Sequence, residues 1–165
     1  MGIDLDVIPL VGETVPLAAV LDCLAGEGMT STFRKLGTER QVRRDEGLEI
    51  DGAYEVGTSG NLMLYVNPTD EDDEDYEQDM LEEYGRNLSA LETEEVCKQW
   101  AKVGYSFTVS SGVGRTREDS SLQKHLVAAL ARATNGFVIV EDNDVLSLSI
   151  GIYPPGDVIA AQVLI

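Results

Sequence analysis

The sequence is short of positive charge and of the residues that build metal and nucleophilic sites. Its 165 residues include 12 Lys or Arg against 30 Asp or Glu, with two Cys and one His. So few Cys and His exclude the usual zinc sites, and Cys23 and Cys97 are expected to be free, buried thiols. A net charge of −18 argues against direct binding of nucleic acid or of an anionic membrane.

Long apolar runs and a targeting signal are also missing. No apolar stretch reaches the roughly 18 residues that a membrane span requires. The chain opens on acidic, alternating residues instead of a basic and then apolar leader. We therefore expect a cytoplasmic protein without a membrane span. With 43% hydrophobic and 25% charged residues, the chain is expected to form one globular domain over residues 1–165.

The spacing of apolar residues predicts an α+β fold. Strands are expected at residues 3–10, 48–51, 53–56, 61–66, 105–110, 137–140 and 145–150. Helices are expected after a Thr14 cap, within residues 70–84, and after capping boxes that begin at Ser89 and Ser120. Residues 158–165 fit a strand or a helix. The predicted architecture is a mixed or antiparallel sheet with about four helices packed on it.

Most of the negative charge lies in one segment, residues 70–96. This segment holds thirteen acids and a single base, Arg86. Its apolar residues come late (Met80, Leu81, Tyr84 and Leu88), so we expect a helix that is anchored at its C-terminal half and has an exposed acidic beginning. A local concentration of charge favours attraction of a basic partner over a general solubility role.

Other interpretations of the acidic segment stay open or fail on spacing. The calcium-binding EF-hand pattern lacks its Gly at position six and its Glu at position twelve, so we expect no metal and no cofactor. A helix rises about 1.5 Å per residue, close to the spacing of about 1.7 Å per charge in B-DNA, so the segment could mimic DNA as anti-restriction phage proteins do. A solvated face that only keeps the protein soluble, including salt adaptation, is a further alternative.

No catalytic residues are predicted. His125 has no evident nucleophile or carboxylate partner, which favours packing at the edge of the core. The loop at residues 110–117 lacks the spacing of a phosphate loop. The bases between Arg34 and Arg44 are expected to pair with the protein's own acidic face. Glu141, Asp142 and Asp144 form a small acidic group at a predicted turn, and Asp142 and Asp144 are the candidates if the protein is an enzyme.

A family resemblance comes from the C-terminal part of the chain. Residues 105–153, which include YSFTVSSGVGRTREDSSLQKHLVAALARATNGFVIVEDND, predict a strand, a polar loop, a capped helix and a further strand. This unit resembles those of small acidic immunity proteins from bacterial toxin–immunity systems. The resemblance implies a stoichiometric inhibitor, and it carries over no individual functional residue.

Charge and resemblance together predict a binding protein and not an enzyme. Its acidic surface would attract a basic, nuclease-like toxin and then occlude the toxin's active site. Three apolar residues within that surface would serve as anchors. The predicted contact residues are Asp70, Asp72, Asp73, Glu74, Asp75, Tyr76, Glu77, Asp79, Met80, Glu83 and Tyr84, of which Tyr76, Met80 and Tyr84 are the anchors.

Overall fold

The protein folds around one seven-stranded sheet, seen in a computed structural model that describes residues 2–12, 14–38, 40–70 and 72–164. The strand order is β2-β3-β4-β5-β1-β6-β7, and every neighbouring pair is antiparallel. The strands are β1 (Ile3–Ile8), β2 (Phe33–Lys35), β3 (Ala53–Val56), β4 (Leu62–Pro68), β5 (Tyr105–Ser111), β6 (Phe137–Val140) and β7 (Gly151–Tyr153). The predicted α+β class is confirmed, with an antiparallel sheet.

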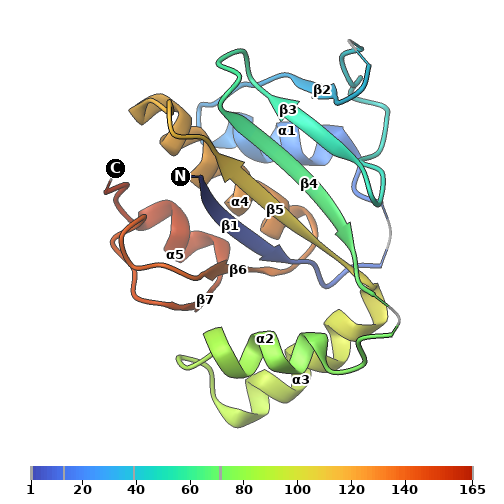
Figure 1. Ribbon diagram of the computed structural model, residues 1–165, viewed down its shortest axis with the longest axis vertical. Helices are drawn as coiled ribbons and strands as arrows, with labels where there is room; N and C mark the ends of the chain where they lie inside the picture. Colours follow the sequence, from blue (N-terminus) through green and yellow to red (C-terminus); the bar gives the residue numbers. More distant parts are fainter. Residues whose placement is uncertain (1, 13, 39, 71, 165) are drawn as a thin grey trace.

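Five helices lie within the described residues: α1 (Leu17–Gly26), α2 (Tyr76–Tyr84), α3 (Ala90–Val103), α4 (Arg117–Ala133) and α5 (Pro155–Ala160). Three of them, α1, α4 and α5, cover one face of the sheet, with α4 in the middle. Figure 1 shows α1 and α4 behind strands β3, β4, β5 and β1. Side chains such as Leu5, Val7 and Val109 point into this main core and are almost completely buried.

Helices α2 and α3 form a hairpin on the opposite face, below the strands in Figure 1. The hairpin covers only the part of the sheet near β1, β6 and β7, where it builds a second core from Ile8, Leu81, Val96, Trp100, Ile139 and Ile152. Asn87, in the link between the two helices, fixes this position. Its Nδ2 donates to the carbonyl of Ile152 at 2.8 Å, and its Oδ1 accepts the Ile152 N–H at 2.9 Å.

The rest of that second face, over β3, β4, β5 and the start of β1, carries polar side chains. Tyr65 of β4, Thr108 of β5 and Asp6 of β1 lie in one cross-strand row. All three are half-buried, whereas their neighbours on the opposite face are buried. The sheet therefore has one fully covered face and one face that is covered only at the β6–β7 end.

Several predicted helix ends are confirmed. Ser89 caps α3 through a capping box with Glu92, and Gly104 ends α3 in the left-handed region with φ of 79°. Asn135 and Gly136 follow α4, and Asn135 is also left-handed with φ of 53°. Gly136 is required for space, since a Cβ there would lie 1.8 Å from the carbonyl oxygen of Ile8.

Two predicted helix starts are wrong. Helix α4 begins one turn before the expected Ser120 box, because Thr116 and Asp119 form a capping box of the same pattern. Helix α1 begins at Leu17 after Pro16, so Thr14 is not its cap. In both cases the capping pattern occurs twice or lies close to a proline, and tertiary packing selects the start.

The predicted strands at 48–51 and 145–150 are also wrong. At Asp51 the backbone turns with φ of 68°, and the Gly52 N–H donates to the carbonyl of Glu49. In the second segment only Leu146 forms a bridge, to Val163, and the strand itself begins at Gly151. Within the ambiguous segment that starts at Val158, helix α5 continues only to Ala160, and Val163 forms the bridge to Leu146. None of the helices among the described residues is long and apolar enough to cross a membrane.

Candidate functional site

An exposed acidic turn leads from β4 into α2. The carboxylate of Asp70 accepts the N–H of Asp72 at 3.0 Å, and its carbonyl accepts the N–H of Asp73 at 3.0 Å. Helix α2 then starts at Tyr76, so the predicted exposed beginning is a hydrogen-bonded turn. We define the acidic surface as the exposed acids of this turn and of α2: Asp70, Asp72, Asp73, Glu74, Asp75, Asp79, Glu82 and Glu83.

No ion pair joins the acidic surface to any base within the described residues. The bases of residues 34–44 pair instead with acids close to them, as in Arg40–Glu46 at 2.6 Å and Arg44–Asp22 at 2.9 Å. The expectation that these bases pair with the acidic segment was therefore wrong, since all their acidic partners lie between residues 22 and 55. The charge of the acidic surface is left uncompensated.

The three predicted apolar anchors turn toward the protein. Tyr76, Met80 and Tyr84 are half-buried and pack against the second core, and the Tyr76 ring meets Trp100 edge-on with centroids 5.6 Å apart. Burial, followed by the negative charge of Asp6, raises the pKa of Tyr76 above its ordinary value. These residues hold α2 in place and present only part of each side chain to a partner.

Glu77 differs from the other predicted contact residues because it is only 5% exposed. It lies on the side of α2 that faces the end of α3, and its carboxylate has no hydrogen bond or ion pair among the described residues. It lines a cavity of about 420 Å³ together with Thr69, Asp70, Asp73, Glu74, Ala101 and Gly104. We call this the Glu77 cavity.

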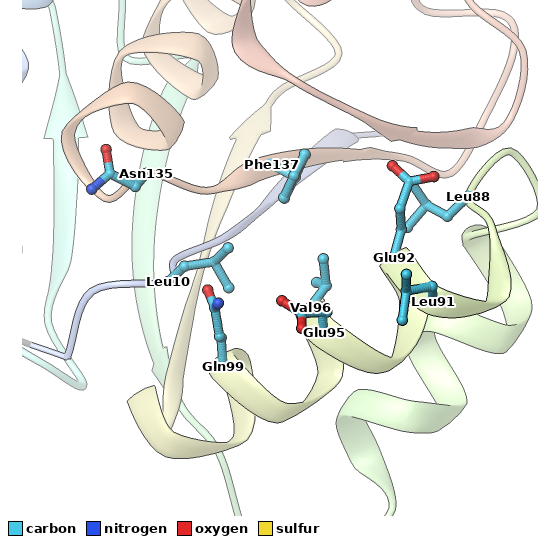
Figure 2. A pocket seen from close by; sticks show the side chains of 9 residues that line it. All are labelled: Leu10, Leu88, Leu91, Glu92, Glu95, Val96, Gln99, Asn135 and Phe137. Carbon is cyan, nitrogen blue, oxygen red and sulfur yellow. The ribbon is translucent and has the colours of Figure 1, made fainter.

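An apolar groove lies along the other side of α3. Figure 2 shows side chains of α3 on one side of this groove and Leu10 and Phe137 on the other. Its volume is about 450 Å³. Leu91, at its rim, is 71% exposed, and Glu92 and Glu95 add negative charge beside it. The groove therefore combines exposed apolar side chains with the carboxylates of Glu92 and Glu95. The helical spacing in the sequence predicted that Leu91 faces the core, and this prediction was wrong.

A carboxyl pair on the sheet was not predicted. Glu141 follows β6, and its side chain hydrogen-bonds that of Asp6 on the neighbouring strand β1. The hydrogen bond, burial and the charge of Asp6 raise the pKa of Glu141 to about 8. Asp6 also accepts a hydrogen bond from Thr108 Oγ1 at 2.6 Å, and Thr108 in turn accepts one from Asn67 Nδ2 at 2.9 Å.

The pair predicts a specific dependence of stability on pH. The pKa of Glu141 rises from 4.5 to about 8 on folding, so the protonated group stabilises the fold fully below about pH 4.5 and this contribution is lost as the pH rises through 8. In Glu141→Gln the loss is absent. Between about pH 5 and pH 8.5 the variant should gain about 1–2 kcal/mol over wild type, a value limited by solvent screening of the half-exposed pair.

Urea unfolding of both proteins at the two pH values measures this gain. Asp144→Asn, which removes a charge from the nearby exposed turn, is the matched control and should show no such gain. An equal difference between Glu141→Gln and wild type at both pH values would refute the assignment of the shared proton to Glu141.

Asp142 and Asp144, the candidates for an enzyme, are not part of the Asp6–Glu141 pair. Asp142 and Asp144 are exposed, and the Asp142 carboxylate accepts the N–H of Asp144 at 2.8 Å, which is the ordinary use of Asp in a turn. His125 is half-buried, and its Nδ1 lies 2.8 Å from the carbonyl of Ser121 on its own helix. Cys23 and Cys97 are both free and half-buried.

Neither metal-binding geometry nor comparison with known proteins assigns a function to these sites. Among the residues that the structure describes, no three Asp, Glu, His or Cys side chains are arranged to hold a metal ion. Comparisons with protein-family models, with curated proteins and with solved structures find no match. The acidic surface, the Glu77 cavity and the apolar groove are therefore interpreted from their own chemistry.

Proposed function

We propose that this protein binds a basic protein through the acidic surface and neutralises it by covering its functional site. The observation that carries the proposal is that, within the described part of the chain, the acidic surface makes no ion pair, whereas the bases of residues 34–44 are paired with acids close to them. Unpaired charge of one sign attracts a partner of the opposite sign and raises the association rate.

The shape of the surface favours one compact partner site. Helix α2 has nine residues, which corresponds to a length of about 13 Å. A DNA-mimic protein needs a longer line of charge to replace a duplex, whereas a compact patch suits the active-site cleft of a single basic protein. The resemblance of residues 105–153 to immunity proteins agrees with a toxin of the nuclease type as this partner.

The apolar groove supplies the contact that charge alone lacks. Interfaces depend on a few buried apolar anchors, and the acids that rim the groove suit an apolar side chain flanked by Lys or Arg on the same basic partner. Leu91→Ser should weaken partner binding about 5- to 10-fold, the cost of one lost apolar contact. Its stability should stay within about 0.5 kcal/mol of wild type because Leu91 is exposed.

Binding kinetics and thermal unfolding of the same Leu91→Ser sample check this prediction. The dissociation rate should increase while the salt dependence of association is unchanged, since no charge is altered. Equal binding by wild type and variant would remove the groove from the interface without affecting the acidic surface.

The proposed function is tested by capture of partners from the native cell lysate. The baits are wild type, an acidic-turn variant (Asp72→Asn, Asp73→Asn, Glu74→Gln) and a charge-control variant (Asp51→Asn, Glu118→Gln, Asp157→Asn). Both variants lose three exposed negative charges, and the control acids lie outside the acidic surface. Captures are run at about 50 mM and about 500 mM NaCl, since high salt screens surface charge.

One basic protein that is held at low salt by wild type and the charge-control variant, but not by the acidic-turn variant, supports the proposal. Its identity then separates the alternatives: a toxin supports the inhibitor function, and a restriction enzyme supports the DNA-mimic function. Identical partners on all three baits would overturn the proposal and leave the acidic surface as solvated surface.

A further inference from the structure

We propose that the Glu77 cavity binds the guanidinium group of an arginine supplied by the basic partner. This inference rests on the proposed function and names the chemistry of one contact within it. The cavity lies where the acidic turn, α2 and the end of α3 meet.

Glu77 is the first observation that points to a cation. Proteins normally pair a carboxylate that lines a confined space with a hydrogen-bond donor or a counter-charge. Glu77 is only 5% exposed and lines the cavity, and no hydrogen bond or ion pair to its carboxylate is found among the described residues. The bases of α3 do not supply one: Lys98 pairs with Glu94 at 3.1 Å, and Lys102 is exposed.

Thr69 is the second observation. Its Oγ1 is buried and has no hydrogen-bond partner among the described residues, although buried hydroxyls are nearly always hydrogen-bonded. Thr69 lines the same cavity as Glu77, and its N–H donates to the carbonyl of Gly104 at 2.9 Å. The cavity is therefore lined by an unpaired carboxylate and by the residue that carries an unpaired, buried hydroxyl.

The end of α3 adds to the negative potential. Ala101, in the last turn, and Gly104, which caps the helix, both line the cavity. The C-terminus of a helix carries a partial negative charge from its unpaired carbonyl groups, which favours cations close to it. The helix end, Glu77 and the acids of the turn thus all make the electrostatic potential in the cavity more negative.

The spread of these groups favours a large cation over a metal ion. Within the described part of the chain no three acidic side chains converge on a point that could hold a metal. The cavity measures about 420 Å³, which has room for a planar guanidinium. Its five N–H donors can reach separate acceptors such as Glu77 and Thr69, whereas a lysine ammonium is a single compact charge.

The test uses small probes with the intact protein. Nα-acetyl-arginine N-methylamide, the lysine counterpart and the neutral norleucine counterpart are each titrated into labelled protein, and backbone amide shifts are followed by NMR. We expect the arginine probe to shift the amides of Glu77, Ala101 and Gly104 in a saturable way, the lysine probe to bind at least threefold more weakly, and the norleucine probe to shift none of them.

Two variants localise the effect. Glu77→Gln should abolish the saturable shifts with little change in side-chain shape, and its amide spectrum reports directly whether the fold is intact. Asp157→Asn, an exposed change outside both the acidic surface and the cavity, should retain them. If Glu77→Gln proved unfolded, Thr69→Val would replace it and should weaken binding by about 3- to 10-fold, as expected for one lost hydrogen bond to a charged group.

The outcomes separate this inference from the proposed function. Shifts that are absent, that appear equally with all three probes, or that persist in Glu77→Gln would overturn the arginine site, while capture of a basic partner through the acidic surface would still stand. Saturable arginine binding without any partner on the wild-type bait would support the site and refute the proposed function.

Discussion

The acidic-turn variant should bind the basic partner about 30-fold more weakly than wild type at low salt, because three unpaired charges that steer and contact the partner are removed. The residues concerned, Asp72, Asp73 and Glu74, are exposed and make no ion pair within the described residues. Their removal therefore breaks no side-chain ion pair among the residues that the structure describes, and the effect should appear as a lower association rate.

The matched comparison is the charge-control variant, whose affinity should stay within about threefold of wild type because its three exposed acids lie outside the acidic surface. Stopped-flow association with the captured partner, at several salt concentrations, measures both. The difference between wild type and the acidic-turn variant should shrink as salt increases. An equal loss of affinity in both variants would mean that net charge alone matters, and not the position of the acidic surface.

Trp100→Ala should lower the free energy of unfolding by about 3–5 kcal/mol, which is typical for removal of a fully buried large aromatic side chain. Trp100 is 0% exposed and lies at the centre of the second core, between the α2–α3 hairpin and the sheet. Its Nε1 donates to the carbonyl of Tyr105 at 3.0 Å, and its ring meets Tyr76 edge-on. The change removes both the apolar contact and the hydrogen bond.

Trp100→Phe separates these two contributions. It keeps an aromatic ring in the second core but leaves the Tyr105 carbonyl without this donor, so it should cost about 1–3 kcal/mol. Urea unfolding followed by far-UV circular dichroism measures all three proteins, since the only tryptophan of the chain is the one replaced. Equal stability of Trp100→Ala and wild type would mean that the hairpin is not held to the sheet by this core.

Local patterns predicted the elements that tertiary contacts do not override. The Ser89 capping box, the left-handed Gly104 and the Asn135–Gly136 stop all depend on a few neighbouring residues, and all are found. The α4 start failed because two capping patterns follow each other directly, at 116–119 and 120–123, and packing of α4 on the sheet selects Thr116. The strand expected at 145–150 failed because this segment meets the C-terminal tail and does not join the sheet: Leu146 bridges Val163, and the Ser147 N–H donates to the carbonyl of Gln162.

The sequence predicted where the negative charge of the candidate site lies, but not how its side chains are arranged. Composition located the acidic surface, because uneven charge is visible in the sequence itself. The inward packing of Tyr76, Met80 and Tyr84 depends on where the hairpin meets the sheet, and helical spacing alone gives a face without saying what covers it. The Asp6–Glu141 pair depends on strand register across a separation of more than a hundred residues, so no local pattern indicated it.

The burial of Glu77 was hidden for a similar reason. In the sequence it is one acid among many in residues 70–83. In the structure its position on α2 turns it toward Ala101 and Gly104 at the end of α3, whereas Asp79 and Glu83 on the same helix are exposed. Only the packing of α2 against α3 separates the buried carboxylate from its exposed neighbours.

The most direct test of the account is a map of the surface that the captured basic partner protects. Backbone hydrogen exchange of the protein is compared with and without a saturating amount of that partner. The account predicts slower exchange in residues 72–84 and at the end of α3 near Gly104, with little change in β2 and β3, which lie at the opposite edge of the sheet. Protection confined to β2 and β3, with unchanged exchange in residues 72–84, would contradict it.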